Sequence, residues 1–200
     1  GMGRLGSREL TAGSDLDLIF LYRHDEDAEA SDGEKQLYPQ QYFIRLVQRL
    51  IAAMSAPTAE GVVYELDFRL RPSGNSGPLA TYLDSFVKYQ REEAWTWEVQ
   101  ALTRARPVAG DAGLVGKIGE TLSGLLATQR DGRKFTKDIA KMRATILKEK
   151  PAANAFDVKL ADGGLTDIEF ISQWGNLLTA NSGASVEDRS ALALIETLPA

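Results

Sequence analysis

The sequence predicts an α+β fold, in which a mixed sheet is flanked by helices and followed by a mainly helical segment. Three observations predict it. Asp15–Tyr22 is a short apolar run bounded by Gly13 and Ser14, as is typical of a buried strand. Residues 62–71 alternate apolar and charged side chains, which indicates a strand with one wet face. Between and after these strands, apolar residues recur at helical spacing.

The composition excludes several classes of protein. Two hundred residues suffice for one sizeable domain or two small ones. The chain has no cysteine, so disulfides and cysteine-based metal sites are excluded. No apolar run approaches the roughly 20 residues of a membrane span, and the net charge of −5 does not indicate nucleic-acid binding. We therefore expect a cytoplasmic protein without membrane or nucleic-acid partners.

The chain opens with a glycine-rich turn over residues 3–14, which includes Gly6 and Ser7. We expect a helical turn at Ser7–Thr11. Backbone N–H groups in such a turn can hold phosphate oxygens. An ordinary tight turn is the alternative, because glycine and serine alone are a weak signal.

Asp15 and Asp17 open the first predicted strand. Residues i and i+2 of a strand point to the same side, so the two carboxylates project together. Carboxylates held so close repel each other unless a cation lies between them, and a hard ion such as Mg²⁺ suits oxygen ligands. The alternative is a pair of solvated side chains at a strand edge.

An acidic loop over residues 23–35 follows, which we interpret as solvated. Gln36–Ser55 is then predicted to be an amphipathic helix that ends before Pro57. Its apolar stripe is interpreted as core; the stripe consists of Tyr42, Phe43, Leu46, Val47, Leu50, Ile51 and Met54.

The second strand, Val62–Arg71, carries Glu65, Asp67, Arg69 and Arg71 on one face. Such a row can be only the wet face of a sheet. Beside the first strand, however, Asp67 would complete a cluster of three carboxylates. Arg69 and Arg71 would then contact phosphate oxygens, which suit the guanidinium fork. The turn-rich loop over residues 72–78 is positioned to cover a ligand, or is a simple connector.

The rest of the chain is mainly helical. The predicted elements are a helix over 81–106 with a break near Glu93-Ala94, helices over 114–129 and 135–148, a short strand over 156–160, and helices over 165–178 and 185–198. We expect a catalytic core over residues 1–110, with its first strand cut short, and a helical region over 111–200 that begins a helical bundle.

The predicted cluster of Asp15, Asp17 and Asp67 suits the transfer of a nucleotidyl group. Two Mg²⁺ ions held by three carboxylates would neutralise a triphosphate, activate an attacking hydroxyl and stabilise the departing pyrophosphate. A nucleoside triphosphate would then be the substrate, and the turn at Gly6 and Ser7 would hold its β- and γ-phosphates.

Several long blocks resemble one enzyme family. The run Gly-Arg-Leu-Gly-Ser-Arg-Glu-Leu-Thr-x-x-Ser-Asp-Leu-Asp-Leu-Ile-Phe-Leu-Tyr resembles the nucleotidyltransferase domains of the DNA polymerase β superfamily. More narrowly, it resembles the bifunctional glutamine synthetase adenylyltransferases/adenylyl-removing enzymes. Further matching blocks lie at residues 64–74, 94–106 and 159–170, so the resemblance covers most of residues 3–174.

The resemblance implies an activity and a set of site residues. The chain is most similar to the C-terminal, adenylylating domain of that family, which transfers AMP from ATP to a tyrosine of glutamine synthetase. The alternatives are phosphorolytic removal of AMP, and a catalytically silent domain that binds a regulator such as a PII signalling protein. By the resemblance, the metal ligands are Asp15, Asp17 and Asp67; the nucleotide site includes Gly6, Ser7, Arg69 and Arg71; and Glu65, Lys159, Asp167 and Glu169 are additional site residues without a derived role.

Overall fold

The computed structural model describes residues 1–62 and 64–181. The chain forms two compact units that interleave in the sequence. The first contains Gly1–Ala94 and Ala105–Thr121, and the second contains Trp95–Arg104 and the chain from Leu122 onward. The helix predicted over 185–198 lies outside the described residues, and the functional division predicted near residue 110 stays a prediction.

The first unit combines two small parallel sheets with helices, which confirms the α+β prediction. Strand β1 (Leu16–Asp17) pairs with β3 (Leu66–Asp67), and β2 (Phe20–Tyr22) pairs with β4 (Ala80–Tyr82). Parallel neighbours need long crossover connections, and the chain between β2 and β4 supplies one that contains α2. The helical elements of this unit are α1 (Gly3–Gly6), α2 (Pro39–Met54), η1 (Gly74–Ser76) and α3 (Leu83–Glu92).

Both predicted strands are shorter than the sequence pattern indicated. The single strand over 15–22 is wrong, because β1 and β2 belong to different sheets. The strand over 62–71 is also wrong beyond Leu66–Asp67. The chain turns after β3, where the carboxylate of Asp67 accepts the N–H of Arg69 at 2.8 Å and the carbonyl of Phe68 accepts the N–H of Arg71 at 3.3 Å. Strand β4 was not predicted.

Helix α2 packs on the sheet formed by β2 and β4. The buried core there contains Tyr22, Val47 and Ala80, and the rings of Tyr22 and Phe43 stack at 4.3 Å between centroids. The prediction that the whole apolar stripe is core is wrong, because the apolar residues cover more of the helix than one sheet can bury. Four of them are 39–48% exposed: Tyr42, Leu46, Leu50 and Met54.

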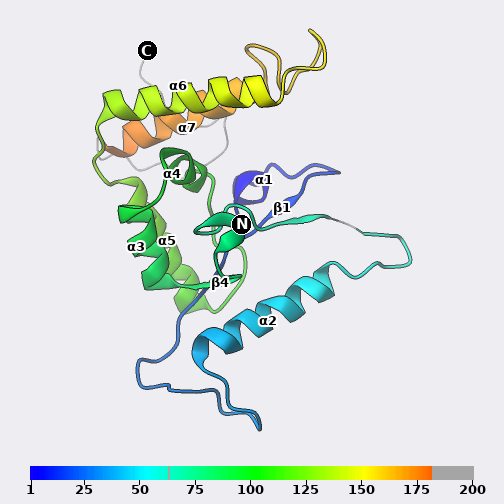
Figure 1. The fold of residues 1–200 in the computed structure, drawn as a ribbon, viewed down its shortest axis with the longest axis vertical. Helices are drawn as coiled ribbons and strands as arrows, with labels where there is room; N and C mark the ends of the chain where they lie inside the picture. Colours follow the sequence, from blue (N-terminus) through cyan, green and yellow to red (C-terminus); the bar gives the residue numbers. More distant parts are fainter. Residues whose placement is uncertain (63, 182–200) are drawn as a thin grey trace. The chain divides into compact units, whose positions relative to one another are not determined.

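The second unit is helical in its described part. It contains α4 (Thr96–Leu102), α6 (Gly132–Glu149) and α7 (Leu165–Asn181), and it includes the end of α5 (Ala112–Leu126), which begins in the first unit. Figure 1 shows α6 and α7 side by side, and both contact α4. The predicted break in the 81–106 helix is confirmed, because α3 ends at Glu92 and α4 begins at Thr96.

The strand predicted over 156–160 is wrong, and turns take its place. The carboxylate of Asp157 accepts the N–H groups of Ala153, Lys159 and Leu160 at 3.0–3.2 Å. A short acidic side chain that bonds the nearby backbone in this way competes with strand pairing.

Within the described ranges, no helix has both the length and the apolar character that are needed to cross a bilayer.

Candidate functional site

The pairing of β1 with β3 brings two predicted metal ligands together. Asp17 lies directly opposite Asp67 in the parallel register, and the N–H of Leu18 donates to the carbonyl of Asp67 at 2.8 Å. Neighbouring strands are about 4.8 Å apart, and opposed residues of a parallel pair point to the same face. Asp15 precedes β1 by one residue and is exposed. The site therefore consists of a cross-strand carboxylate pair with a third acid at its end.

The carboxylate of Asp67 is held by its neighbour Arg69. The Arg69 side chain donates to Oδ2 through Nε at 2.7 Å and through Nη2, while Oδ1 accepts the Arg69 backbone N–H. This side-chain hydrogen bond lowers the pKa of Asp67, against the opposing effect of burial. The pKa of Arg69 is raised by the same bond first, and further by the charges of Asp67, Asp17 and Asp15. The guanidinium thus lies in the field of all three acids.

The side chains at this site have the chemistry of divalent-ion ligands, but three of them do not converge on one point in this structure. Carboxylate oxygens are the ligands that Mg²⁺ prefers, and α1 approaches Asp17 closely because Gly3 has no side chain. A Cβ at Gly3 would overlap Oδ2 of Asp17. In the part of the chain that the structure describes, however, no three acidic or histidine side chains converge closely enough to hold a metal ion. Asp67 is turned to Arg69 instead, so the predicted convergence of three carboxylates is not present in this conformation.

The segment predicted to hold phosphate is the C-terminal end of α1. Ser7 caps this four-residue helix, and its hydroxyl contacts Oε2 of Glu9 at 2.6 Å and the carbonyl of Gly3 at 3.1 Å. The N–H groups of Gly6 and Ser7 donate to the carbonyls of Met2 and Gly3. These backbone donors are therefore engaged within the segment, and their role toward phosphate stays a prediction.

Arg71 holds the loop that follows β3. Its buried guanidinium donates to the carbonyls of Phe68 at 2.7 Å, Gly77 at 3.2 Å and Asn75 at 3.3 Å. This loop is tight, since Ser73 has a φ of 60° and Gly74 a φ of 53°. The Arg71 guanidinium is thus bound to three backbone carbonyls, whereas the Arg69 side chain is 70% exposed.

The remaining predicted residues occupy other positions. Glu65 lies just before β3 and is exposed; its carbonyl accepts the N–H of Leu16. Lys159 is exposed in the second unit. Glu169 on α7 pairs at 3.0 Å with Arg104, which lies two residues beyond the end of α4, while Asp167 pairs with Arg143 of α6.

The two acids of α7 therefore contact different parts of the second unit, the turn after α4 and helix α6. The hydrogen bond from Arg143 lowers the pKa of Asp167, against the effect of burial. These pairs hold the first turns of α7 to α6 and to the turn that follows α4. Their role in the chemistry stays a prediction.

Two residues at the site had no predicted role. Gly3 makes room for the carboxylate of Asp17, as described above. Arg106 lies far along the chain but donates through Nε to the carbonyl of Gly6 at 3.0 Å and through Nη2 to that of Leu5 at 3.1 Å. It stabilises the carbonyl end of α1. No pattern in the sequence indicates the Arg106 contact, since 100 residues separate Gly6 from Arg106.

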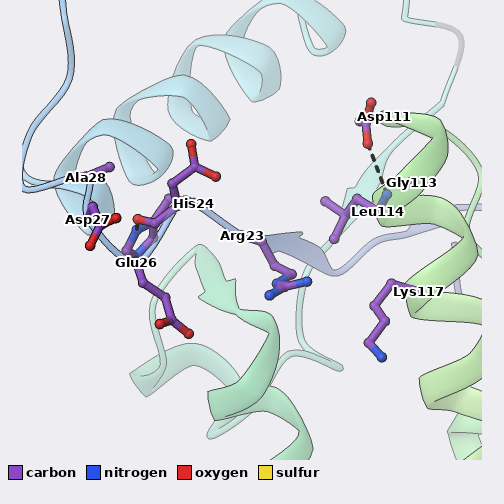
Figure 2. A pocket seen from close by; sticks show the side chains of 10 residues that line it. Arg23, His24, Glu26, Asp27, Ala28, Asp111, Gly113, Leu114 and Lys117 are labelled. Atoms are coloured by element: carbon purple, nitrogen blue, oxygen red, sulfur yellow. Dashed lines mark hydrogen bonds between the residues drawn. The ribbon is translucent and has the colours of Figure 1, made fainter.

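An open pocket of about 1070 Å³ lies elsewhere in the first unit. Figure 2 shows that the loop after β2 and the start of α5 line it, with Arg23, His24 and Lys117 among the lining residues. Both acidic and basic side chains line it, and none of the predicted site residues contributes to it. We therefore place the candidate site at β1 and β3 and not at this pocket.

Comparison with known proteins gives matches to one enzyme family. The family model described as glutamate-ammonia ligase adenylyltransferase matches residues 1–120. Bifunctional glutamine synthetase adenylyltransferase/adenylyl-removing enzymes are among the similar proteins. That of Brucella suis biovar 1 (strain 1330) is 61% identical over 88% of this chain and 18% of its own length. That of Mesorhizobium japonicum is 59% identical over 92% and 19%, and that of Agrobacterium fabrum 52% identical over 100% and 20%.

The chain thus spans about a fifth of the length of these relatives. The matched region contains β1 and β3, with Asp17 and Asp67 in register. On the strength of the family match and of these identities, the chain belongs to the glutamate-ammonia ligase adenylyltransferase family.

Proposed function

We propose that this chain carries a nucleotidyl-transfer site that moves AMP from ATP to a tyrosine hydroxyl of glutamine synthetase. In that reaction the hydroxyl loses its proton and its oxygen bonds to the α-phosphorus. The bond from that phosphorus to pyrophosphate then breaks. Family membership supports the substrate class. The proposed location of the site rests on one observation, that Asp17 lies directly opposite Asp67 in the register of β1 and β3.

Each predicted residue has a proposed part in this reaction. Asp17, Asp67 and Asp15 would hold one or two Mg²⁺ ions, which supply positive charge to the triphosphate when bound. Arg69 would bind a phosphate oxygen, since its side chain is exposed beside the acids. Arg71 would fix the loop over residues 72–78 above the nucleotide, through the three carbonyls that it already binds.

Phosphorolytic removal of AMP is the second candidate, because the relatives' names give both an adenylyltransferase and an adenylyl-removing activity. In phosphorolytic removal, a phosphate oxygen bonds to the AMP phosphorus and the tyrosine oxygen leaves, which yields ADP and the free hydroxyl. Both reactions would use the same carboxylates. Regulation by a PII signalling protein would act on the longer protein and is part of the same proposal.

The test combines the chain with ATP labelled in its α-phosphate, Mg²⁺ and glutamine synthetase. We expect label on glutamine synthetase with the wild type and none above background with Asp17→Asn. A parallel reaction supplies adenylylated glutamine synthetase and inorganic phosphate, and ADP formation there would identify the removing activity. Equal signals from wild type and Asp17→Asn in both reactions would reject the proposed site.

A further inference from the structure

We propose that the side chain of Arg69 is a built-in counter-ion that divalent cations must displace from Asp67, and that this exchange frees the guanidinium for the nucleotide. The proposal rests on the proposed function, because it takes Asp17 and Asp67 to be metal ligands. It goes further by making Arg69 a competitor of the metal ion as well as a partner of phosphate.

The competition follows from how Asp67 is bound. Its Oδ2 accepts two N–H groups of the same guanidinium, and its Oδ1 accepts the Arg69 backbone N–H. A carboxylate that accepts a charge-assisted fork has few lone-pair directions left for another cation. The side chain of Asp67 is only 12% exposed whereas that of Arg69 is 70% exposed, so solvent screens this pair in part. Asp67 cannot join Asp17 around an ion while Arg69 holds it.

The exchange is local because the two halves of Arg69 have different roles. The guanidinium side chain is 70% exposed and can rotate into solvent. The backbone N–H of Arg69 would keep its bond to Oδ1, and the turn after β3 is independently held by Arg71. Releasing the guanidinium therefore breaks no contact of the loop over residues 72–78. Asp67 would stay in register with Asp17 throughout.

The charges of the site favour such an exchange. The charge of Arg71 also acts on Asp67, and Arg69 places a single positive charge in the field of Asp15, Asp17 and Asp67. A divalent ion places twice that charge between the same oxygens. The displaced guanidinium then lies beside a site that has lost its excess negative charge, where a phosphate group is a better partner than before.

The experiment measures Mn²⁺ binding to the whole chain by calorimetry, without nucleotide. The variants are Arg69→Gln, Arg69→Lys, Asp17→Asn and the control Arg91→Gln, which removes a like charge from the exposed last turn of α3. Relative to Arg91→Gln, we expect Arg69→Gln to bind Mn²⁺ about three- to tenfold more tightly, the range for a fork that is partly screened by solvent. Arg69→Lys, which keeps the charge but loses the fork, is expected between them.

A second readout needs no activity. In ¹⁵N spectra of arginine side chains, the Nε–H signal that is missing in Arg69→Gln identifies Arg69. That signal is expected to shift when Mg²⁺ is added to the wild type. If Arg69→Gln and Arg91→Gln bound Mn²⁺ equally tightly while Asp17→Asn bound it more weakly, the counter-ion role of Arg69 would be overturned and the proposed metal ligands would stand. Unchanged affinity in Asp17→Asn would overturn both. If circular dichroism shows that Arg69→Gln does not fold, the Mn²⁺ affinity of Arg69→Lys is compared with that of Arg91→Gln instead, and the same outcomes decide.

Discussion

The contact between Gly3 and Asp17 gives the sharpest prediction for the site. Gly3 has a φ of 49°, and a Cβ there would overlap Oδ2 of Asp17 and lie 3.3 Å from its Cγ. Nonbonded heavy atoms pack at about 3.5–4.0 Å, so the carboxylate of Asp17 would have to move by roughly 1 Å in Gly3→Ala. The left-handed backbone adds a cost of about 1–2 kcal/mol in the free energy of folding.

A matched control separates the displacement of the Asp17 carboxylate from the cost of the left-handed backbone. Gly61 also has a positive φ, 96°, but a Cβ there would meet nothing within 4 Å. Gly61→Ala is therefore expected to lose about 1–2 kcal/mol of stability through its backbone alone. Gly3→Ala is expected to lose a similar amount and, in addition, roughly a hundredfold in AMP transfer, because a misplacement of about 1 Å at a reacting centre has that effect.

Urea unfolding would measure the stability of both variants, and transfer of α-labelled AMP to glutamine synthetase would measure their activity. The reasoning would be refuted if Gly3→Ala and Gly61→Ala transferred AMP at rates within twofold of each other. It would also be refuted if the amide signals of Asp17 and its neighbours stayed unchanged in Gly3→Ala, since the carboxylate would then not have moved.

Three further predictions concern the loop, the helix and the ion pairs. Arg71→Gln removes three carbonyl contacts, so amide hydrogen exchange over residues 72–77 is expected to accelerate while that of α2 stays unchanged; equal protection in variant and wild type would contradict the clamp. Val47→Ala is expected to destabilise the protein by about 2 kcal/mol, because it removes buried methyl groups. Leu46→Gln, on the exposed face of α2, should change the free energy of unfolding by less than about 0.5 kcal/mol. Similar losses of stability in both variants would contradict the assignment of buried and exposed faces. The pKa of Asp167 is lowered in the folded state, so its contribution is complete above the unfolded value of 3.8 and is lost as the pH falls through the lower folded value. Acid unfolding of Asp167→Asn should therefore depend less on pH below about 4 than that of wild type, and parallel profiles would rule out the contribution.

Helix positions could be predicted well from the sequence, because their signal is local. The break between α3 and α4 near Glu93 and the run of helices after residue 111 follow from apolar spacing and from breakers. Strand lengths could not be predicted in the same way. Alternation over 62–71 continues past β3, but Asp67 and Arg71 bend the chain through side-chain bonds that no periodicity encodes.

The sequence by itself determined which residues are available for the proposed chemistry: two aspartates spaced to share a strand face, a third in a second strand, and arginines two and four residues beyond it. It also determined the family, since long runs of residue identity need no coordinates. Only the tertiary structure decided that Asp17 and Asp67 are neighbours, that Arg69 holds Asp67, and that Arg71 and Arg106 bind backbone carbonyls. The physical reason is that strand register and the partner of a guanidinium depend on residues that are distant in the chain. Local patterns specify which side chains are available, and the packing of α1, β1 and β3 specifies which of them meet.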